Sequence, residues 1–210
     1  LGSVNEAGFN RKGEILAFTV DAAEKDANGL FVVDLRSGRV HPLDDDARIY
    51  SRVTWNEPGT ALAVLKGVEI DKQAEKHNVL LAFPDLYGVL SATPEPGPAM
   101  LDTTAAGFPR GLVVSEKREL LWSADGKLIF LGVRAQRAAP DTADKKKGTD
   151  ELPNVDVWNT TDERIQSVQM ARAEADQNFS YRAAFDVAAG RYIPLADSTM
   201  KELEVTLDGR

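Results

Sequence analysis

The chain has 210 residues, 43% of them hydrophobic, and a formal net charge of -8 that comes from 33 acidic and 25 basic residues. This charge argues against a nucleic-acid partner, which needs a clustered basic face, and no apolar run approaches the roughly 18 to 20 residues required to cross a bilayer. Cysteine is absent, which excludes disulfides, cysteine nucleophiles and thiolate metal sites.

The first predicted unit runs from about residue 4 to residue 43. Its polar loop, 21–29, resembles a hairpin connection on the rim of a sheet, with Asn28-Gly29 as the expected turn. Three aspartates at 44–46 could in principle bind calcium, but the alternating spacing of a calcium loop is missing, so we expect a solvated connection. Strands are expected at 15–20, 30–35 and 39–43, with Ile15, Ala17, Leu30, Val32 and Leu35 in the core.

The second unit is expected over about residues 50–102. Residues 50–55 alternate between apolar and polar, which indicates a strand with one buried face, and a second strand follows at 61–65. The apolar run 78–83 predicts a well-buried third strand, and 100–102 could be the outermost one. Prolines at 84, 94, 96 and 98 argue against a regular helix between these last two strands.

The third unit is expected over about residues 112–195. Its centre is the stretch 121–130, two apolar runs joined by Asp125-Gly126, a turn typical of hairpins. An insertion follows around 134–154, in which a lysine triplet is offset by nearby acids, so a solvated loop is expected.

The remainder of the third unit leaves two alternatives open. Residues 155–158 predict a short strand, whereas 162–171 fit either a helical face or a strand. We favour two long antiparallel strands, joined by a turn at 176–178 that leads into 181–187. A fourth unit would start at about 200–210, and because its Asp208-Gly209 corner is not followed by a strand, we expect the sequence to be a piece of a longer polypeptide.

Two sequence markers recur along the chain. One is an apolar residue, three turn-type residues and a glycine, which ends at Gly13, Gly59, Gly126 and Gly209. The other aligns residues 34–43 with residues 186–195, with Asp, Gly, Arg, Pro and Leu in the same register. All-strand repeats of roughly 40 to 50 residues are typical of propeller blades. The predicted fold is therefore all-β: a partial β-propeller of about three four-stranded antiparallel blades plus the start of a fourth.

The tryptophans divide into two kinds. Trp55 and Trp122 occupy the same repeat position, which predicts packing between blades. Trp158 breaks the pattern, and it could either be buried beneath the insertion or contact a substrate or partner. The candidate contact residues are Trp158, Asp162, Arg164 and Gln166.

No motif for catalysis, cofactor binding or metal binding is found. The chain has no G-x-S-x-G nucleophile elbow, no G-x-x-x-x-G-K and no G-x-G-x-x-G. Neither His41 nor His77 has a helix-spaced partner for a metal. We therefore assign no catalytic, cofactor-binding or metal-binding residue.

The repeats resemble those of a known family. W-S-x-D-G at 122–126 and D-L-x-S-G at 34–38 are similar to turns in the propellers of the prolyl oligopeptidase family and in TolB-like propellers. Residues 155–158, 162–169 and 179–184 are similar to the dipeptidyl-peptidase-IV-like propellers of bacterial secreted members. The resemblance implies export, and a propeller that caps an α/β-hydrolase domain and filters the peptides that reach it. That hydrolase domain is not in this sequence, so no catalytic residue is carried over.

Two functions of different class follow. The chain could be the access-controlling propeller segment of a serine peptidase, whose partners would be a C-terminal hydrolase domain and a peptide substrate. It could instead belong to a propeller that binds a protein through rim loops such as 21–29 and 134–154. An open arc of blades exposes strand edges and apolar faces, so we also expect self-association.

If no active site lies in these residues, the purified chain should not hydrolyse a chromogenic dipeptide. Turnover that persists through rigorous purification would contradict this expectation.

Overall fold

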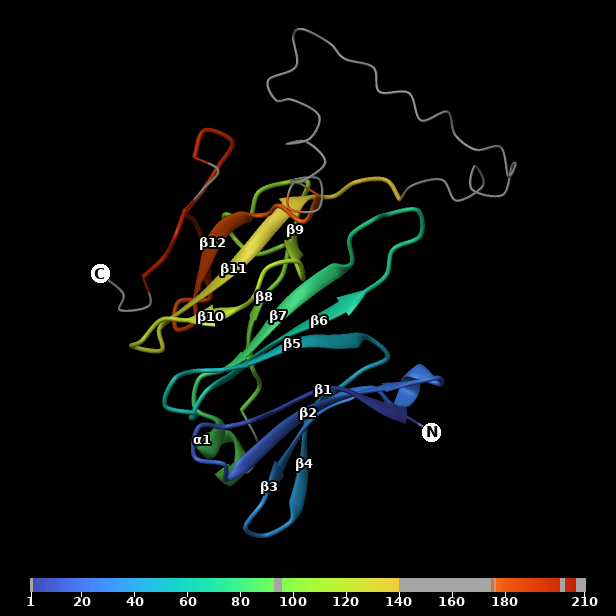
Figure 1. Ribbon diagram of the computed structural model, residues 1–210, viewed down its shortest axis with the longest axis vertical. Helices are drawn as coiled ribbons and strands as arrows, with labels where there is room; N and C mark the ends of the chain where they lie inside the picture. The colour runs from blue at the N-terminus through green and yellow to red at the C-terminus, as the bar shows by residue number, and fades with distance from the viewer. Residues whose placement is uncertain (1, 93–95, 140–174, 176, 201–202, 207–210) are drawn as a thin grey trace, which may run out of the picture.

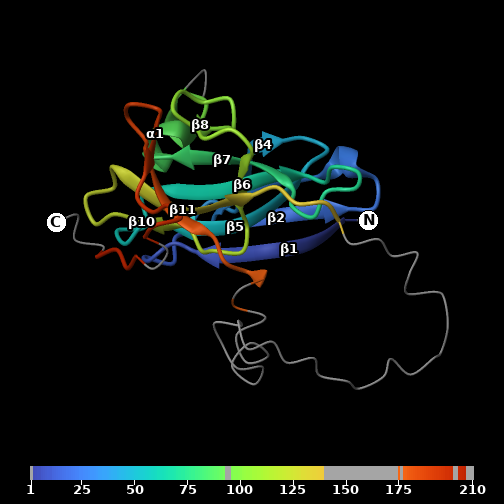
Figure 2. The ribbon, with the colours of Figure 1, turned by 90° about the horizontal axis from the view of Figure 1, so that it is seen from above.

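The computed structural model describes residues 2–92, 96–139, 175, 177–200 and 203–206. Three antiparallel sheets stack along the long axis of the molecule (Figure 1) and lie one behind another when seen from above (Figure 2). Within each sheet neighbouring strands follow one another in sequence order, except that β9 (Leu112–Ser115) of the third sheet pairs with β11 (Leu128–Ala135). The described chain is therefore an all-β partial propeller of three blades, as predicted.

Each blade is a meander of short strands. The first contains β1 (Gly2–Phe9), β2 (Ile15–Ala22), β3 (Gly29–Asp34) and β4 (Arg39–Asp45), with a 3-10 turn, η1 (Lys25–Ala27), between β2 and β3. The second contains β5 (Ile49–Trp55), β6 (Leu62–Val68), β7 (His77–Phe83), helix α1 (Leu86–Ser91) and β8 (Ala99–Leu101). The third contains β9 (Leu112–Ser115), β10 (Leu121–Trp122), β11 (Leu128–Ala135), β12 (Tyr181–Asp186) and β13 (Arg191–Pro194). Because β9 and β10 pair with opposite ends of β11, together they take the place of one innermost strand.

The repeated corner turns are the hairpins that the sequence predicts. In each corner a backbone N–H donates to the carbonyl five residues later, at 2.9 to 3.0 Å, and the glycine N–H donates back to the first residue. The glycines adopt the left-handed conformation, which side chains disfavour. The corners begin at Asn10, Asn56 and Ser123, and their glycines are Gly13, Gly59 and Gly126.

The second sequence marker also has one structural role. In blades one and three, Asp34 and Asp186 begin the tight turn between the third and fourth strands, and both carboxylates accept backbone N–H groups within the turn. Gly38 and Gly190 have positive φ in these turns. In blade two the same connection is the longer stretch 84–98, which contains α1.

The expectation of no helix between the prolines is wrong. Proline is unfavourable inside a helix but not before its first turn, and Pro84 precedes the N-cap residue Asp85. The Asp85 carboxylate accepts the Gly88 N–H at 3.0 Å, so a six-residue helix fits between Pro84 and Pro94.

Neighbouring blades share apolar cores. Side chains of β6 alternate: Leu62 and Val64 lie in the core between blades one and two, while Ala63 and Leu65 lie in the core between blades two and three. Burying one such leucine contributes roughly 1.5 to 3 kcal/mol. Because both faces are covered, the two middle strands of the central blade contain apolar runs, 62–65 in β6 and 79–83 in β7.

The predicted packing role of the two tryptophans is confirmed. The Trp55 indole N–H donates to the Gly8 carbonyl at 3.0 Å, and that of Trp122 donates to the Thr54 carbonyl at 3.3 Å. Each bond runs from a blade to the innermost strand of the preceding one. Phe9 occupies the same repeat position in blade one, where it is 60% exposed.

The first blade has one face with no sheet packed on it among the described residues. On this face Phe18 and Phe31 stack at 5.5 Å between ring centroids, beside the exposed Val4 and Phe9. The predicted core residue Leu35 is wrong, since it is exposed: β3 ends at Asp34, and the alternation of the strand stops there.

The three aspartates are not a purely solvated connection. Asp44 and Asp46 both pair with Lys66, at 2.7 and 2.9 Å, and Asp44 also accepts the Tyr50 hydroxyl. Lys66 lies on the face of β6 that is turned toward blade one. At the same repeat position, blade one has Val20 and blade three has Val133. Its ammonium therefore links the end of β4 to β6 of the next blade.

Asn28-Gly29 is not the turn of the first rim loop. The turn is formed by η1, and Asn28 is buried with extended backbone. Its amide oxygen accepts the Ala22 N–H at 2.7 Å, and its amide nitrogen donates to the Arg48 carbonyl at 3.1 Å. Asn28 therefore ties the loop to the start of blade two.

Several predicted segments lie outside the described residues. They are the insertion from residue 140 onward, the strand at 155–158, the ambiguous stretch from 162 and the last corner from 207. The described residues 203–206 form neither helix nor strand, and β12 and β13 match the strands expected at 181–187 and after Gly190. No helix in the described part of the chain is long and apolar enough to cross a membrane.

Gly59→Ala should destabilise the protein by about 3 kcal/mol, because an alanine there combines positive φ with a Cβ only 2.7 Å from the Arg11 backbone nitrogen. Gly13→Ala is the matched control: it has the same turn position and φ sign but no neighbour within 4 Å, and should cost about 1 kcal/mol. Urea unfolding measures both, and equal losses would contradict the steric explanation.

The Asp46 carboxylate should make folding sensitive to acid. The hydrogen bond from Lys66 lowers the pKa of Asp46 in the fold. Its contribution to stability is thus present above the unfolded-state pKa of about 3.9 and is lost as pH falls through the folded-state pKa. Urea midpoints measured from pH 6 downward should fall less for Asp46→Asn than for the wild type, whereas Asp26→Asn, in exposed η1, should follow the wild type.

Candidate functional site

A cleft of about 420 Å³ lies where α1 meets the outer strands of blade one. In both ribbon views α1 is at the end of the sheets opposite the N-terminus (Figures 1 and 2). We call this hollow the α1 cleft; its lining residues are Glu14, Ile15, Asp34, Arg36, Ser37, Arg39, His41, Tyr87, Leu90 and Ser91.

Helix α1 is fixed in place on two sides. Leu86 and Val89 are buried in the core between blades one and two, and the Leu86 N–H donates to the Thr60 carbonyl in the second corner at 2.9 Å. The adjoining side of the helix, with the half-buried Tyr87 and Leu90 at the edge of the same core, presents Tyr87, Leu90 and Ser91 to the cleft. One wall of the cleft is therefore rigidly anchored to the blade interface.

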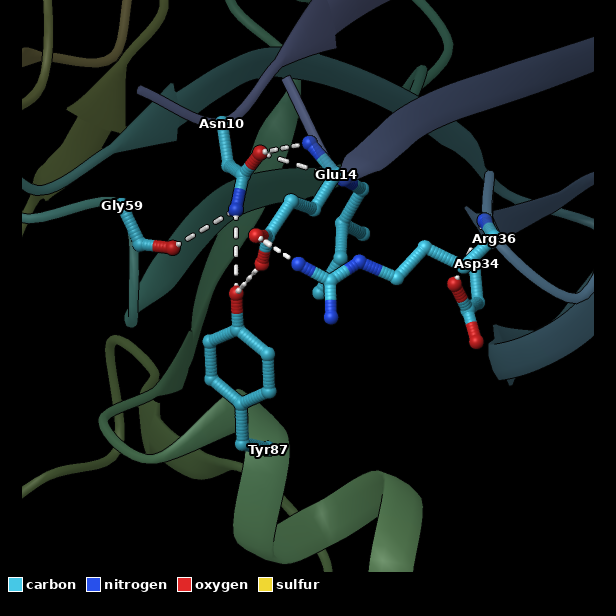
Figure 3. Close-up of polar contacts among 7 residues, drawn as sticks. Asn10, Glu14, Asp34, Arg36, Gly59 and Tyr87 are labelled. Carbon is cyan, nitrogen blue, oxygen red and sulfur yellow. Dashed lines mark hydrogen bonds and ion pairs between the residues drawn. The ribbon is translucent and has the colours of Figure 1, made fainter. Parts of the chain in front are cut away.

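Asn10 organises the floor of the site (Figure 3). Its amide oxygen accepts the N–H groups of Glu14 and Ile15, at 2.9 and 3.1 Å. Its amide nitrogen donates to the Gly59 carbonyl and to the Tyr87 hydroxyl, both at 3.2 Å. This buried side chain thus uses all its polar atoms and joins corner one, corner two and α1.

Charged groups border the cleft in a fixed arrangement. The Tyr87 hydroxyl donates to one Glu14 oxygen at 3.3 Å, and Arg36 pairs with the other (Figure 3). The hydrogen bonds from Ser37 and from the Arg36 backbone lower the pKa of Asp34. Both carboxylates are therefore already engaged by groups of the protein.

Two cationic or polar side chains of β4 remain on the other wall. Arg39 is exposed and forms no ion pair with any residue that the structure describes, and His41 is half-buried beside it. Leu90 and Ile15 add apolar surface. The arrangement can hold a ligand that combines an anionic group with an apolar one.

A second hollow, of about 570 Å³, lies along the β6–β7 loop. Its lining is almost entirely the single loop 69–76, together with Lys25 and Glu116. The buried pair Glu75–Arg134, at 3.1 Å, anchors that loop to β11. Walls from one loop offer little apolar contact, so we regard the α1 cleft as the better candidate.

The histidines lie at different places in the fold. His41 lines the α1 cleft, whereas His77 begins β7, with its Nε2 3.2 Å from Asp102 and 2.9 Å from the Thr103 hydroxyl. Burial alone would raise the pKa of Asp102, but hydrogen bonds from Thr103 outweigh it and lower the pKa. Among the described residues no group of three or more His, Asp or Glu side chains is placed to hold a metal ion.

The predicted contact residues Trp158, Asp162, Arg164 and Gln166 all lie outside the described residues, so their assignment stays a prediction. Sequence reasoning missed α1 and with it Tyr87. A signal for the helix was present: Asp85 is a good N-cap residue, and Leu86, Val89 and Leu90 have helical spacing.

No family model matches the chain, and neither does any curated protein. Several solved structures are similar to it, among them the following three. TolB from Acinetobacter baumannii is 14% identical with a TM-score of 0.44, over 95% of this chain and 34% of TolB. A prolyl endopeptidase is 14% identical with a TM-score of 0.42, over 64% of this chain and 19% of the enzyme. The β-propeller domain of the trilobed protease from Pyrococcus furiosus is 12% identical with a TM-score of 0.45, over 92% of this chain and 43% of that one. The chain thus spans less than half of the length of each.

Tyr87→Phe should lower the free energy of unfolding by about 1 kcal/mol, because it removes a hydroxyl that both donates and accepts between α1 and corner one. Tyr181→Phe, a half-buried tyrosine on β12, is the matched control and should change stability by less than about 0.5 kcal/mol. Urea unfolding distinguishes them, and an unchanged Tyr87→Phe protein would show that the hydroxyl does not hold the helix.

Proposed function

We propose that the chain is a non-catalytic propeller module that binds an extended peptide segment of a protein partner in the α1 cleft. The observation that carries this proposal is the departure of blade two from the repeat. Blades one and three join their last two strands by tight Asp-turns, whereas blade two uses α1 and thereby forms a walled cleft. Propellers host many functions, so the site and not the fold supports this proposal.

A peptide suits the shape of the cleft. Its volume is within the range of roughly 300 to 1,000 Å³ that is usual for ligand pockets. Strand β4 begins at the cleft with Arg39 and, among the described residues, pairs only with β3, so its other edge carries backbone groups that no described strand pairs with. An extended segment can bond to such an edge and place alternate side chains toward the cleft.

The chemistry of the lining favours a segment with an acidic residue near an apolar one. Arg39 supplies a cation that has no carboxylate partner among the described residues, while Leu90 and Ile15 supply apolar contacts. Glu14 and Asp34 are held by Tyr87, Arg36 and Ser37. Their engagement leaves Arg39 as the group that selects an anion.

A second candidate is the access-controlling propeller of a serine peptidase, with a hydrolase domain and a peptide substrate as partners and with export from the cell. The resemblance rests on the W-S-x-D-G and D-L-x-S-G stretches, and each of them forms a turn of its blade. The first joins β10 to β11 in blade three, and the second joins β3 to β4 in blade one. This supports the candidate without distinguishing it from a TolB-like interaction module. An open reading frame that continues into a G-x-S-x-G elbow with downstream Asp and His would favour the peptidase.

The peptide-binding proposal is tested with fluorescein-labelled decapeptides that carry one Glu beside one Leu, compared with the same peptides carrying Gln. Arg39→Glu should weaken binding of the Glu peptides about tenfold, which equals about 1.4 kcal/mol, with little effect on the Gln peptides. Arg191→Glu is the matched control, because Arg191 has the same turn position in blade three, where α1 is absent. Equal losses in both variants, or no binding by the wild type in fluorescence polarisation, would contradict the proposal.

A further inference from the structure

We propose that blade three carries a second, separate binding site for an oxyanion, either a carboxylate or a phosphate, formed by Arg182, Ser180 and Arg118. Arg182 lies at the start of β12, Ser180 directly precedes that strand, and Arg118 lies in the segment between β9 and β10. Gly132 of β11 lies between them. The site is independent of the peptide proposal above, and the two can fail separately.

The backbone brings the three side chains together around Gly132. A Cβ at that glycine would lie 2.5 Å from the Ser180 hydroxyl oxygen and 2.8 Å from the Arg118 Cβ, so both side chains occupy the space that a side chain of residue 132 would need. Arg182 is the direct partner of Gly132 across the β11–β12 ladder. All three therefore project around the same point of the sheet.

The polar atoms at this point are shielded from solvent but lack partners. Ser180 is 1% exposed, and its hydroxyl makes no hydrogen bond within the described part of the chain. The Nε and Nη1 atoms of Arg182 are also buried, with no hydrogen-bond acceptor among the residues that the structure describes. A buried donor without an acceptor costs free energy, and more so when it is charged, so donors that converge in this way indicate an anionic acceptor.

The electrostatics agree with this geometry. Burial, with a smaller effect of the neighbouring Arg118 charge, lowers the pKa of Arg182. No carboxylate within the described part of the chain forms an ion pair with Arg182 or Arg118. Two arginines and a hydroxyl thus lie around Gly132, and the planar fork of N–H donors of a guanidinium matches carboxylate or phosphate oxygens in a bidentate manner.

The site lies on the face of blade three that turns away from blade two. Ile129, Leu131 and Val133 belong to the core shared with blade two, so Gly132 and its partner Arg182 point to the opposite side of the sheet. The α1 cleft lies between blades one and two, at the other end of the stack (Figure 1). Binding at one site is therefore not a consequence of binding at the other.

The test uses the full chain and follows the Arg Nε–H signals by ¹⁵N NMR, together with thermal unfolding. Sodium phosphate and sodium succinate are titrated separately, each against sodium chloride of equal ionic strength. We expect a saturable shift of the Arg182 Nε–H signal and a rise in Tm with at least one of them, because a ligand that binds only the folded state stabilises it. A response to phosphate alone assigns a phosphate ligand, and a response to succinate alone assigns a carboxylate.

Arg182→Met removes the charge but keeps an unbranched side chain. Since it relieves a buried unpaired cation, it should fold at least as stably as the wild type without added anions, yet its affinity for the anion should fall about tenfold or more. Arg110→Gln, an exposed arginine, is the control and should respond as the wild type does. A wild type that shows no saturable shift with either anion, or an anion-dependent Tm rise that Arg182→Met retains in full, would overturn the proposal.

Discussion

A small β-sheet with two apolar faces removes all its apolar area from water only when both faces are covered, and the stacking of the blades follows from that constraint. Blade two satisfies it completely, because alternate side chains of β6 enter two different cores. The tryptophan bonds then set the relation between blades: Trp55 and Trp122 each join a blade to a carbonyl of the preceding innermost strand. Apolar area provides the cohesion, and the indole bonds provide the register.

The α1 cleft is a result of the same packing. Blades that diverge outward from a common axis leave a wedge between their outer strands, and α1 fills the inner part of that wedge with Leu86 and Val89. What remains open is lined by the outer face of the helix and by β4. The shape of the cleft also depends on the interface between blades one and two, because the Asn10 amide bonds to both corners and to Tyr87 of the helix.

Sequence patterns predicted the repeated parts of the fold and missed what departs from the repeat. The corner glycines and the Asp-turns were predictable because positive φ and local carboxylate caps depend on a few adjacent residues. Asn28 and Lys66 were not, because their roles as a buried clamp and an inter-blade ion pair depend on residues of the next blade, brought near only by folding. The α1 cleft needs contacts between residues 10 and 87, and no local pattern encodes such a pair.

Trp55 and Trp122 are intrinsic fluorescence probes of the two blade interfaces. Trp55 reports the interface of blades one and two, and Trp122 that of blades two and three. Indole emission shifts to longer wavelength when water reaches the ring. The emission of Trp55 therefore follows the opening of one interface, and the emission of Trp122 follows the opening of the other. With Trp158, which lies outside the described residues, replaced by phenylalanine, single-tryptophan variants would reveal whether the stack comes apart blade by blade or in one step.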